Sequence, residues 1–63
     1  MKVREIMKRL NREGWYIDRQ RGSHRQYKHP DKPGRVTVSG KPSDDVHPDT
    51  LHDMYDQAGW GKP

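Results

Sequence analysis

Apolar residues near the start of the chain repeat with the period of a helix. Four of them fall at positions i, i+3, i+4 and i+7: Val3, Ile6, Met7 and Leu10. This spacing places them in one stripe, which a helix can bury while its polar residues face water. Gly14 follows the stripe, at the position where a glycine commonly ends a helix. The pattern predicts a first helix over about residues 2–13.

The same spacing returns near the other end of the chain, in Leu51, Met54, Tyr55 and Ala58. Pro48 suits the first position of a helix, and Gly59 follows the last apolar residue. We therefore predict a second helix over about residues 48–58.

The segment between the helices has the pattern of strands and turns. Residues 15–20 begin with the β-favouring run Trp-Tyr-Ile, and residues 35–39 alternate valine with polar residues. A turn at Arg21-Gly22 and a five-residue turn cluster at 30–34 flank a further predicted strand at 23–29. Residues 40–47 have no periodicity and are expected to form a flexible loop.

These elements predict an α+β fold with the order α-β-β-β-α. Short connections between the strands favour a three-stranded antiparallel sheet. Two amphipathic helices need a shared apolar surface, so both are expected to pack on one face of the sheet, leaving the other face to solvent. At 63 residues the chain is expected to form a single domain over residues 1–63.

Side chains alternate along a strand, so the position of one residue predicts the face of the others. Tyr27 is the large apolar candidate for the core in the second strand. Ser23, Arg25 and His29 share its parity, whereas His24, Gln26 and Lys28 have the opposite parity. We expect this second set on the open face, unless a bulge at Gly22-Ser23 shifts the alternation.

Charge is distributed unevenly along the chain. Residues 1–35 contain 11 Lys or Arg against 4 Asp or Glu, and residues 36–63 contain 2 against 5. The basic part is expected to attract a polyanion, most commonly nucleic acid. The chain has no cysteine, which excludes disulfides and thiolate zinc sites. It also has no apolar run long enough to span a membrane, and a cytoplasmic location is expected.

A basic sheet surface that carries a histidine suits the cleavage of RNA without a metal. That reaction needs a proton acceptor, stabilisation of the phosphorane and a proton donor to the leaving oxygen. His24 is the candidate general acid or base, because imidazole exchanges protons near neutral pH. The candidate RNA-binding residues are Lys28, Arg19, Arg21, Arg25, Gln26 and Ser23. No cofactor is expected, and the histidines lack the spacing of a metal site.

The segment Gly22-Ser23-His24-Arg25-Gln26-Tyr27-Lys28-His29-Pro30 resembles the central motif of HicA toxins. So do the end of the first helix (residues 12–15), the third strand (35–38) and the C-terminal part (49–51 and 57–60), so that the resemblance covers nearly the whole chain. It implies a fold similar to a double-stranded-RNA-binding domain and cleavage of mRNA, with the histidine of Gly-Ser-His essential. That role falls on His24. It also implies a HicB-type antitoxin as a protein partner that covers this face.

The chain departs from the family's pattern at two places. Ser39-Gly40-Lys41-Pro42 stands where relatives commonly have Pro-x-His, and Asp49 replaces a glycine. Two other functions stay open: a non-catalytic RNA-binding module of the same fold, and an interaction domain for an acidic protein. In either case His24 is an inert turn residue. The other three histidines, His29, His47 and His52, are expected to be surface residues.

Overall fold

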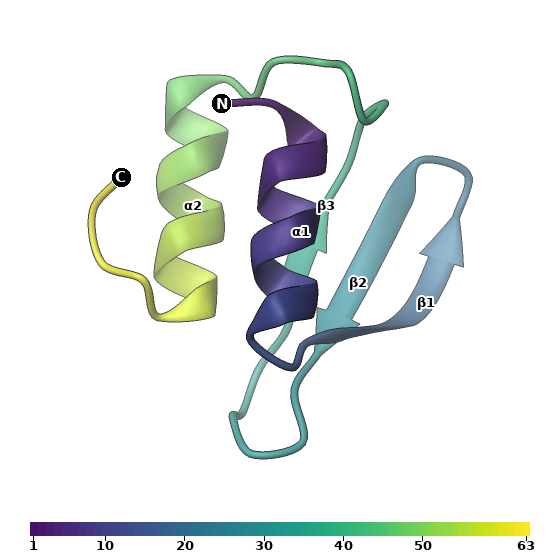
Figure 1. Ribbon diagram of the computed structural model, residues 1–63, viewed down its shortest axis with the longest axis vertical. Coiled ribbons are helices and arrows are strands. Elements are labelled where there is room, and N and C mark those ends of the chain that lie inside the picture. The colour runs from purple at the N-terminus through teal and green to yellow at the C-terminus, as the bar shows by residue number, and fades with distance from the viewer.

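A computed structural model describes residues 1–63 and has the element order α-β-β-β-α. The elements are α1 (Val3–Arg12), β1 (Tyr16–Arg21), β2 (His24–Lys28), β3 (Val36–Val38) and α2 (Pro48–Ala58). The strands form one antiparallel sheet in the order β1-β2-β3, and both helices lie on the same side of it (Figure 1). The α+β fold predicted from the sequence is confirmed, and every predicted boundary lies within one residue of the observed one.

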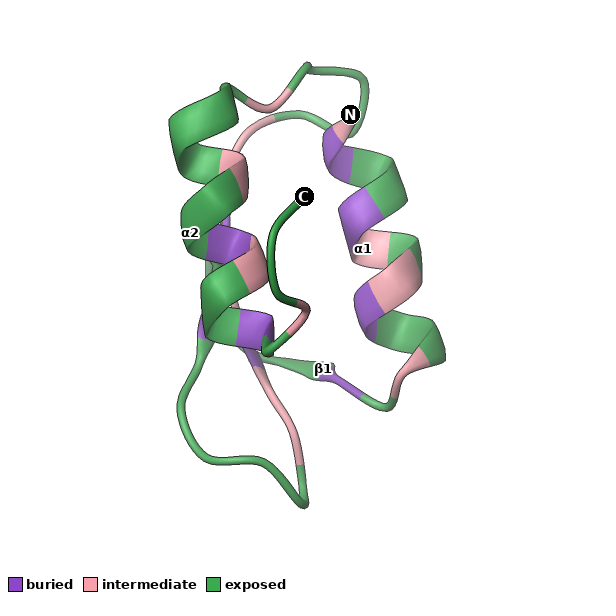
Figure 2. Ribbon diagram, turned by 90° about the vertical axis from the view of Figure 1, so that its left-hand side faces the viewer, coloured by how far each residue is buried: buried purple, intermediate pink, exposed green.

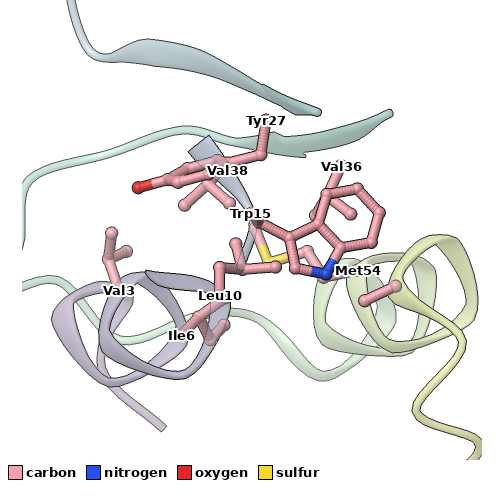
Figure 3. Packing of buried hydrophobic residues seen from close by; sticks show 9 residues of the cluster. Val3, Ile6, Leu10, Trp15, Tyr27, Val36, Val38 and Met54 are labelled. Atoms are coloured by element: carbon pink, nitrogen blue, oxygen red, sulfur yellow. The ribbon is translucent and has the colours of Figure 1, made fainter. Parts of the chain in front are cut away.

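The core lies between the sheet and the two helices (Figure 3). Nine apolar residues form it, each at most 3% exposed: Val3, Ile6, Leu10, Trp15, Tyr27, Val36, Val38, Met54 and Ala58. The buried sides of the two helices face inward, and their outer sides are exposed (Figure 2). Because so few side chains are buried, the domain has little apolar area to offset the entropy of folding.

The loop between β3 and α2 is tied to the start of α1. The Val3 amide donates to the Asp44 carbonyl (2.9 Å), and the Arg4 amide donates to the Pro42 carbonyl (3.0 Å). In the opposite direction, the Val46 amide donates to the Met1 carbonyl (2.9 Å). The first two bonds satisfy amide groups that the first turn of a helix leaves without partners. The loop predicted over residues 40–47 is confirmed, and these bonds tie it to the start of α1.

The ends of the two helices are joined by a group that we call the Arg9–Glu13–Trp60 clamp. The indole Nε1 of Trp60 donates to Glu13 Oε1 (2.8 Å), and Arg9 Nε donates to Glu13 Oε2 (2.9 Å). The Arg9 guanidinium also lies 4.1 Å from the centre of the Trp60 ring, in a cation–π contact. Gly59, with φ of 75°, ends α2 and turns the chain so that Trp60 reaches α1.

The β1–β2 hairpin extends beyond the helical layer (Figure 1). All six residues of β1 are exposed, including two large apolar ones, Tyr16 (48%) and Ile17 (42%). β1 is also an edge strand, since only β2 pairs with it. β1 is thus held mainly by its pairing with β2, while its side chains are available for contacts with other molecules.

Candidate nucleic-acid interface

A two-residue turn places His24 at the beginning of β2. Gly22 and Ser23 form the turn, and Arg21 pairs with His24 at its base. Gly22 has φ of 58°, whereas the φ of Ser23 is not positive. A positive φ at the first turn residue alone is the pattern of a type II′ turn, which favours glycine there and matches the twist of a hairpin. The Gly-Ser sequence therefore sets the point from which the alternation of β2 begins.

The two faces of β2 differ as the alternation predicts. Arg25 and Tyr27 are buried on the helix side, whereas His24, Gln26 and Lys28 lie on the opposite side and are exposed or half-buried. β3 follows the same rule, since Val36 and Val38 are buried opposite Tyr27 and Arg25. The prediction that His24, Gln26 and Lys28 share the open face is confirmed.

β1 contains a bulge that changes which of its side chains reach the open face. Ile17 pairs with Tyr27 and Arg19 pairs with Gln26, so Asp18 is an extra residue between two consecutive rungs. In a regular strand Ile17 and Arg19 would lie on the same face. The bulge separates them, so that Ile17 stays on the helix side while Arg19 and Arg21 join His24 on the open face.

We use "the open face" for the side chains opposite the helices, placed there by the strand register or by contact with side chains that the register places there. They are Tyr16, Asp18, Arg19, Arg21, His24, Gln26, Lys28, Arg35 and Thr37. Four of these nine residues are Lys or Arg, and Asp18 is the one carboxylate among them. The open face thus combines positive charge with an imidazole and an aromatic ring, and this composition suits a phosphate backbone with exposed bases.

Contacts within the open face gather around Asp18. Its Oδ2 lies 3.9 Å from both Lys28 Nζ and Arg35 Nη1. Arg35 Nη1 also donates to Gln26 Oε1 at 2.6 Å. Ion pairs of this length between partly exposed groups are weak, so a phosphate can compete with Asp18 for both cations. Arg35 was not among the residues predicted to bind RNA, although the alternation of Val36 and Val38 already implied an outward position for it.

Arg25 does not belong to the open face. It is only 7% exposed, and its Nη1 donates to the Ser23 carbonyl (3.2 Å) and the Gly40 carbonyl (3.0 Å). The side chain lies on the same side of the sheet as Tyr27 and joins the hairpin to the chain after β3. The expectation that Arg25 contacts RNA is therefore corrected: the guanidinium is buried in a structural role. Ser23 remains exposed in the turn.

His24 is exposed, and its ring has no hydrogen bond to another group of the protein. Arg21 is its cross-strand neighbour on the open face. Side chains directly opposite each other in an antiparallel pair have Cβ atoms roughly 5 Å apart. A phosphate that is held by the Arg21 guanidinium therefore lies within reach of the His24 imidazole.

The other histidines have different surroundings. His29 is half-buried: its Nδ1 accepts from the Asp31 amide (3.0 Å), so its Nε2 carries the proton and donates to the Glu13 carbonyl (2.9 Å). His29, expected to be a surface residue, is thus only partly exposed, and both of its ring nitrogens are bonded within the protein. His47 accepts from the Asp49 amide (3.2 Å) and so caps α2. No three His, Asp or Glu side chains are grouped so that they can hold a metal ion.

The fold and the open face define a class of protein: a small α+β domain with one side of its sheet uncovered, basic and bearing a histidine. The chain belongs to the HicA toxin family, whose family model, described as HicA toxin of bacterial toxin–antitoxin, matches residues 3–60. A comparison with curated proteins found no match. The protein is thus a toxin of the toxin–antitoxin type, which implies an antitoxin partner. Neither of its helices has the length and apolar character that crossing a membrane requires.

Proposed function

We propose that the protein is a metal-independent endoribonuclease that cleaves mRNA, with His24 as its general acid and base. The observation that carries the proposal is the position of His24 beside Arg21, on a sheet face with three further cationic side chains: Arg19, Lys28 and Arg35. An exposed imidazole with such neighbours has both the proton chemistry and the phosphate binding that the reaction needs.

The reaction begins at a ribose 2′-hydroxyl next to the scissile phosphate. His24 accepts the proton of this hydroxyl as its oxygen attacks phosphorus, and Arg21 stabilises the negative charge of the phosphorane. The bond from phosphorus to the 5′-oxygen then breaks, and the imidazolium returns the proton to the leaving oxygen. The products are a 2′,3′-cyclic phosphate and a 5′-hydroxyl, and His24 ends the cycle in its initial neutral state.

The proposed RNA-binding set follows from the open face. Lys28, Arg19 and Arg21 contact phosphates, Gln26 and the exposed Ser23 offer hydrogen bonds, and Arg35 joins them as a further cation. We propose a HicB-type protein as the antitoxin, which neutralises the toxin by covering the same face. Blocking the path of the phosphate backbone is sufficient for inhibition, because the reactive groups lie on an open surface.

Incubation of purified protein with a transcript in the presence of EDTA tests the proposal. Wild type is expected to cleave, and His24→Ala is expected to cleave roughly 10²- to 10⁴-fold more slowly. His52→Ala is the matched control, since it removes an exposed imidazole from α2, on the other side of the sheet. Intact transcripts with wild type, or equal rates for wild type and His24→Ala, would contradict the proposal.

A 2′-deoxy substitution in the RNA identifies the nucleophile. An RNA with a single 2′-deoxy nucleotide at a mapped cleavage site is expected to resist cleavage at that site only. Cleavage there at the normal rate would show that water is the attacking group.

In cells, induced expression of wild type is expected to arrest growth, and His24→Ala is expected to remove the arrest while the protein still accumulates.

One observation favours a second candidate, a non-catalytic RNA-binding module. Catalytic histidines are commonly oriented by a hydrogen bond from the second ring nitrogen, and the ring of His24 has no such partner in the protein. RNA binding that falls steeply with salt, without turnover, would support this candidate. Turnover that depends on His24 would exclude it and would indicate that the bound RNA itself orients the imidazole.

A further inference from the structure

Tyr16 is an aromatic side chain that the fold leaves uncovered on the open face. It is 48% exposed, and its pairing with Lys28 places it on the same face as His24. Its ring has no aromatic or cation–π contact, and its hydroxyl has no hydrogen bond. The other large aromatic residues, Trp15, Tyr27, Tyr55 and Trp60, are buried or half-buried and have packing partners. The packing of the protein therefore assigns no role to the Tyr16 ring.

We infer that Tyr16 is a platform on which an unpaired base of the RNA stacks, and that the preferred substrate is single-stranded. The inference rests on the proposed function and adds to it the class of RNA and a residue that binds a base. An exposed tyrosine offers a flat apolar surface, and stacking on such rings is the usual way in which proteins bind bases of single strands.

The neighbour of Tyr16 supports this assignment. Lys28 lies directly across from it, so one rung of the sheet offers a ring for a base and an ammonium group for a phosphate. This rung lies four residues along β2 from the rung of Arg21 and His24, a distance of about 13 Å. A single strand that runs along β2 can therefore place a phosphate at His24 while a base a short distance away along the chain reaches Tyr16.

A duplex cannot use this surface in the same way. Its bases are paired and stacked on each other, so the ring of Tyr16 meets only the sugar–phosphate backbone. Stacking on Tyr16 thus distinguishes unpaired from paired RNA without a hydrogen bond to any base edge. The cations of the open face bind the phosphates of both single-stranded and duplex RNA, because phosphate contacts are independent of base pairing.

The test measures binding in the His24→Ala background, so that the RNA stays intact. The probe is a short single-stranded RNA that contains 2-aminopurine, whose fluorescence is quenched when it stacks. Tyr16→Ala is expected to weaken binding roughly 5- to 100-fold and to remove the quenching, whereas Tyr16→Phe and Tyr16→Trp keep both. Ile17→Ala is the matched control: it removes an exposed apolar side chain from the other face of the same strand and is expected to change neither.

Two further measurements separate stacking from other roles. The dependence of the binding constant on salt is expected to keep its slope in Tyr16→Ala, because no phosphate contact is lost. Binding of a duplex of the same sequence is expected to be unchanged in this variant. Wild-type affinity in Tyr16→Ala, a loss in Tyr16→Phe as large as that in Tyr16→Ala, or an equal loss for the duplex would each overturn the inference.

Failure of this inference and failure of the proposed function are distinguishable. If the protein binds and cleaves RNA while Tyr16→Ala behaves as wild type, the nuclease proposal stands and the base platform does not. If no RNA is bound at all and Tyr16→Ala weakens the complex with the antitoxin instead, Tyr16 is a protein contact and both proposals are wrong.

Discussion

Tyr27 is the buried apolar residue of β2, the strand that carries three residues of the site. Its side chain is fully buried, and this fixes the alternation of β2, which in turn turns His24 and Lys28 outward. The hydroxyl of Tyr27, however, is buried without a hydrogen-bond partner. Burial raises the pKa of this hydroxyl, although the nearby Arg25 charge partly opposes the shift. The ring is thus needed for the fold, whereas the hydroxyl lowers its stability.

Tyr27→Phe is expected to leave the free energy of unfolding unchanged or to raise it by about 1 kcal/mol at pH 7, because a buried unpaired polar group is removed. The raised pKa gives a second expectation. The unfolded state releases the phenolic proton near pH 10, whereas the folded state holds it to a higher pH. The free energy of unfolding is therefore unaffected by this group below pH 10 and falls as the pH rises through the raised value in the folded state. Urea unfolding across this range should show that loss in wild type and less of it in Tyr27→Phe. A clear loss of stability at pH 7 would instead indicate a partner for the hydroxyl.

At the scale of residues, the alternation of strands predicted the site well where its assumptions hold. It placed His24, Gln26 and Lys28 on the open face, because β2 is regular from the turn to its end. It also gave Arg25 the parity of Tyr27, yet Arg25 was included among the RNA contacts because of its charge. The buried guanidinium shows that parity was the better guide. The two carbonyls that bind it come from a turn and a loop, whose positions the sequence pattern does not give.

At the scale of elements, the bulge in β1 was the feature that the sequence pattern could not predict. The order and ends of the elements followed from apolar periodicity and from glycine and proline positions. A bulge, in contrast, depends on which rungs of two strands pair. The extra residue at Asp18 becomes visible only when Ile17 is seen opposite Tyr27 and Arg19 opposite Gln26. Without it, Arg19 and Arg21 would lie on the same side of β1 as Ile17, toward the helices.

Two single-residue deletions test this role of the bulge. Deletion of Asp18 makes Ile17 and Arg19 neighbours in a regular ladder, so Arg19 and Arg21 keep their places on the open face. Deletion of Gln20 also gives a regular ladder, but it moves Arg19 opposite Arg25 and Asp18 opposite Gln26. RNA binding is expected to be at least as strong as that of wild type in the first variant, which also loses the Asp18 carboxylate, and to weaken in the second, with a salt dependence shallower by roughly 0.7 in log–log slope for the lost phosphate contact.

The two deletion variants shorten the same strand by one residue. When the Gln20 deletion also carries Asp18→Asn, both lack the same carboxylate, and each is a control for the other. Circular dichroism and thermal unfolding establish that both are folded before binding is compared. Equal affinity of the two variants for single-stranded RNA would show that the face on which Arg19 lies is unimportant for binding.

At the scale of the whole molecule, the Arg9–Glu13–Trp60 clamp joins the two helices at one end of a small core. The hydrogen bond from Arg9 lowers the pKa of the Glu13 carboxyl, and the bond from Trp60 acts in the same direction against the effect of burial. Because this pKa is lowered in the folded state, the ionised Glu13 carboxylate contributes fully to stability above about pH 4.5. The contribution is lost as the pH falls through the lowered pKa of the folded protein.

Glu13→Gln is therefore expected to lower the melting temperature by a few degrees at pH 7 and to have a much smaller effect near pH 3. Thermal unfolding followed by circular dichroism from pH 3 to pH 7 measures the difference. Glu5→Gln is a suitable comparison, because Glu5 is an acidic residue of α1 that contacts only the start of its own helix. A difference between wild type and Glu13→Gln that is constant over this pH range would show that charge at Glu13 does not stabilise the clamp.

Carboxylates lie on both sides of the molecule, one on the open face and three on α2. Asp18 lies among the cations of the open face, 3.9 Å from two of them. Asp49, Asp53 and Asp56 are exposed on α2, with their side chains on the part of the helix that faces away from the core. A helix of about 10 Å diameter and the sheet thus separate them from bound RNA, a distance greater than the Debye length of about 8 Å at physiological ionic strength.

One local charge is therefore expected to influence RNA binding more than three remote ones. Asp18→Asn frees Lys28 and Arg35 and should raise the affinity for single-stranded RNA roughly 2- to 10-fold. The triple variant Asp49→Asn, Asp53→Asn, Asp56→Asn changes the net charge three times as much, yet its affinity should stay within about twofold of wild type at 0.15 M salt. A larger effect of the triple variant would place the RNA on the helical side of the protein, because only there are these three carboxylates close enough to act on a phosphate backbone.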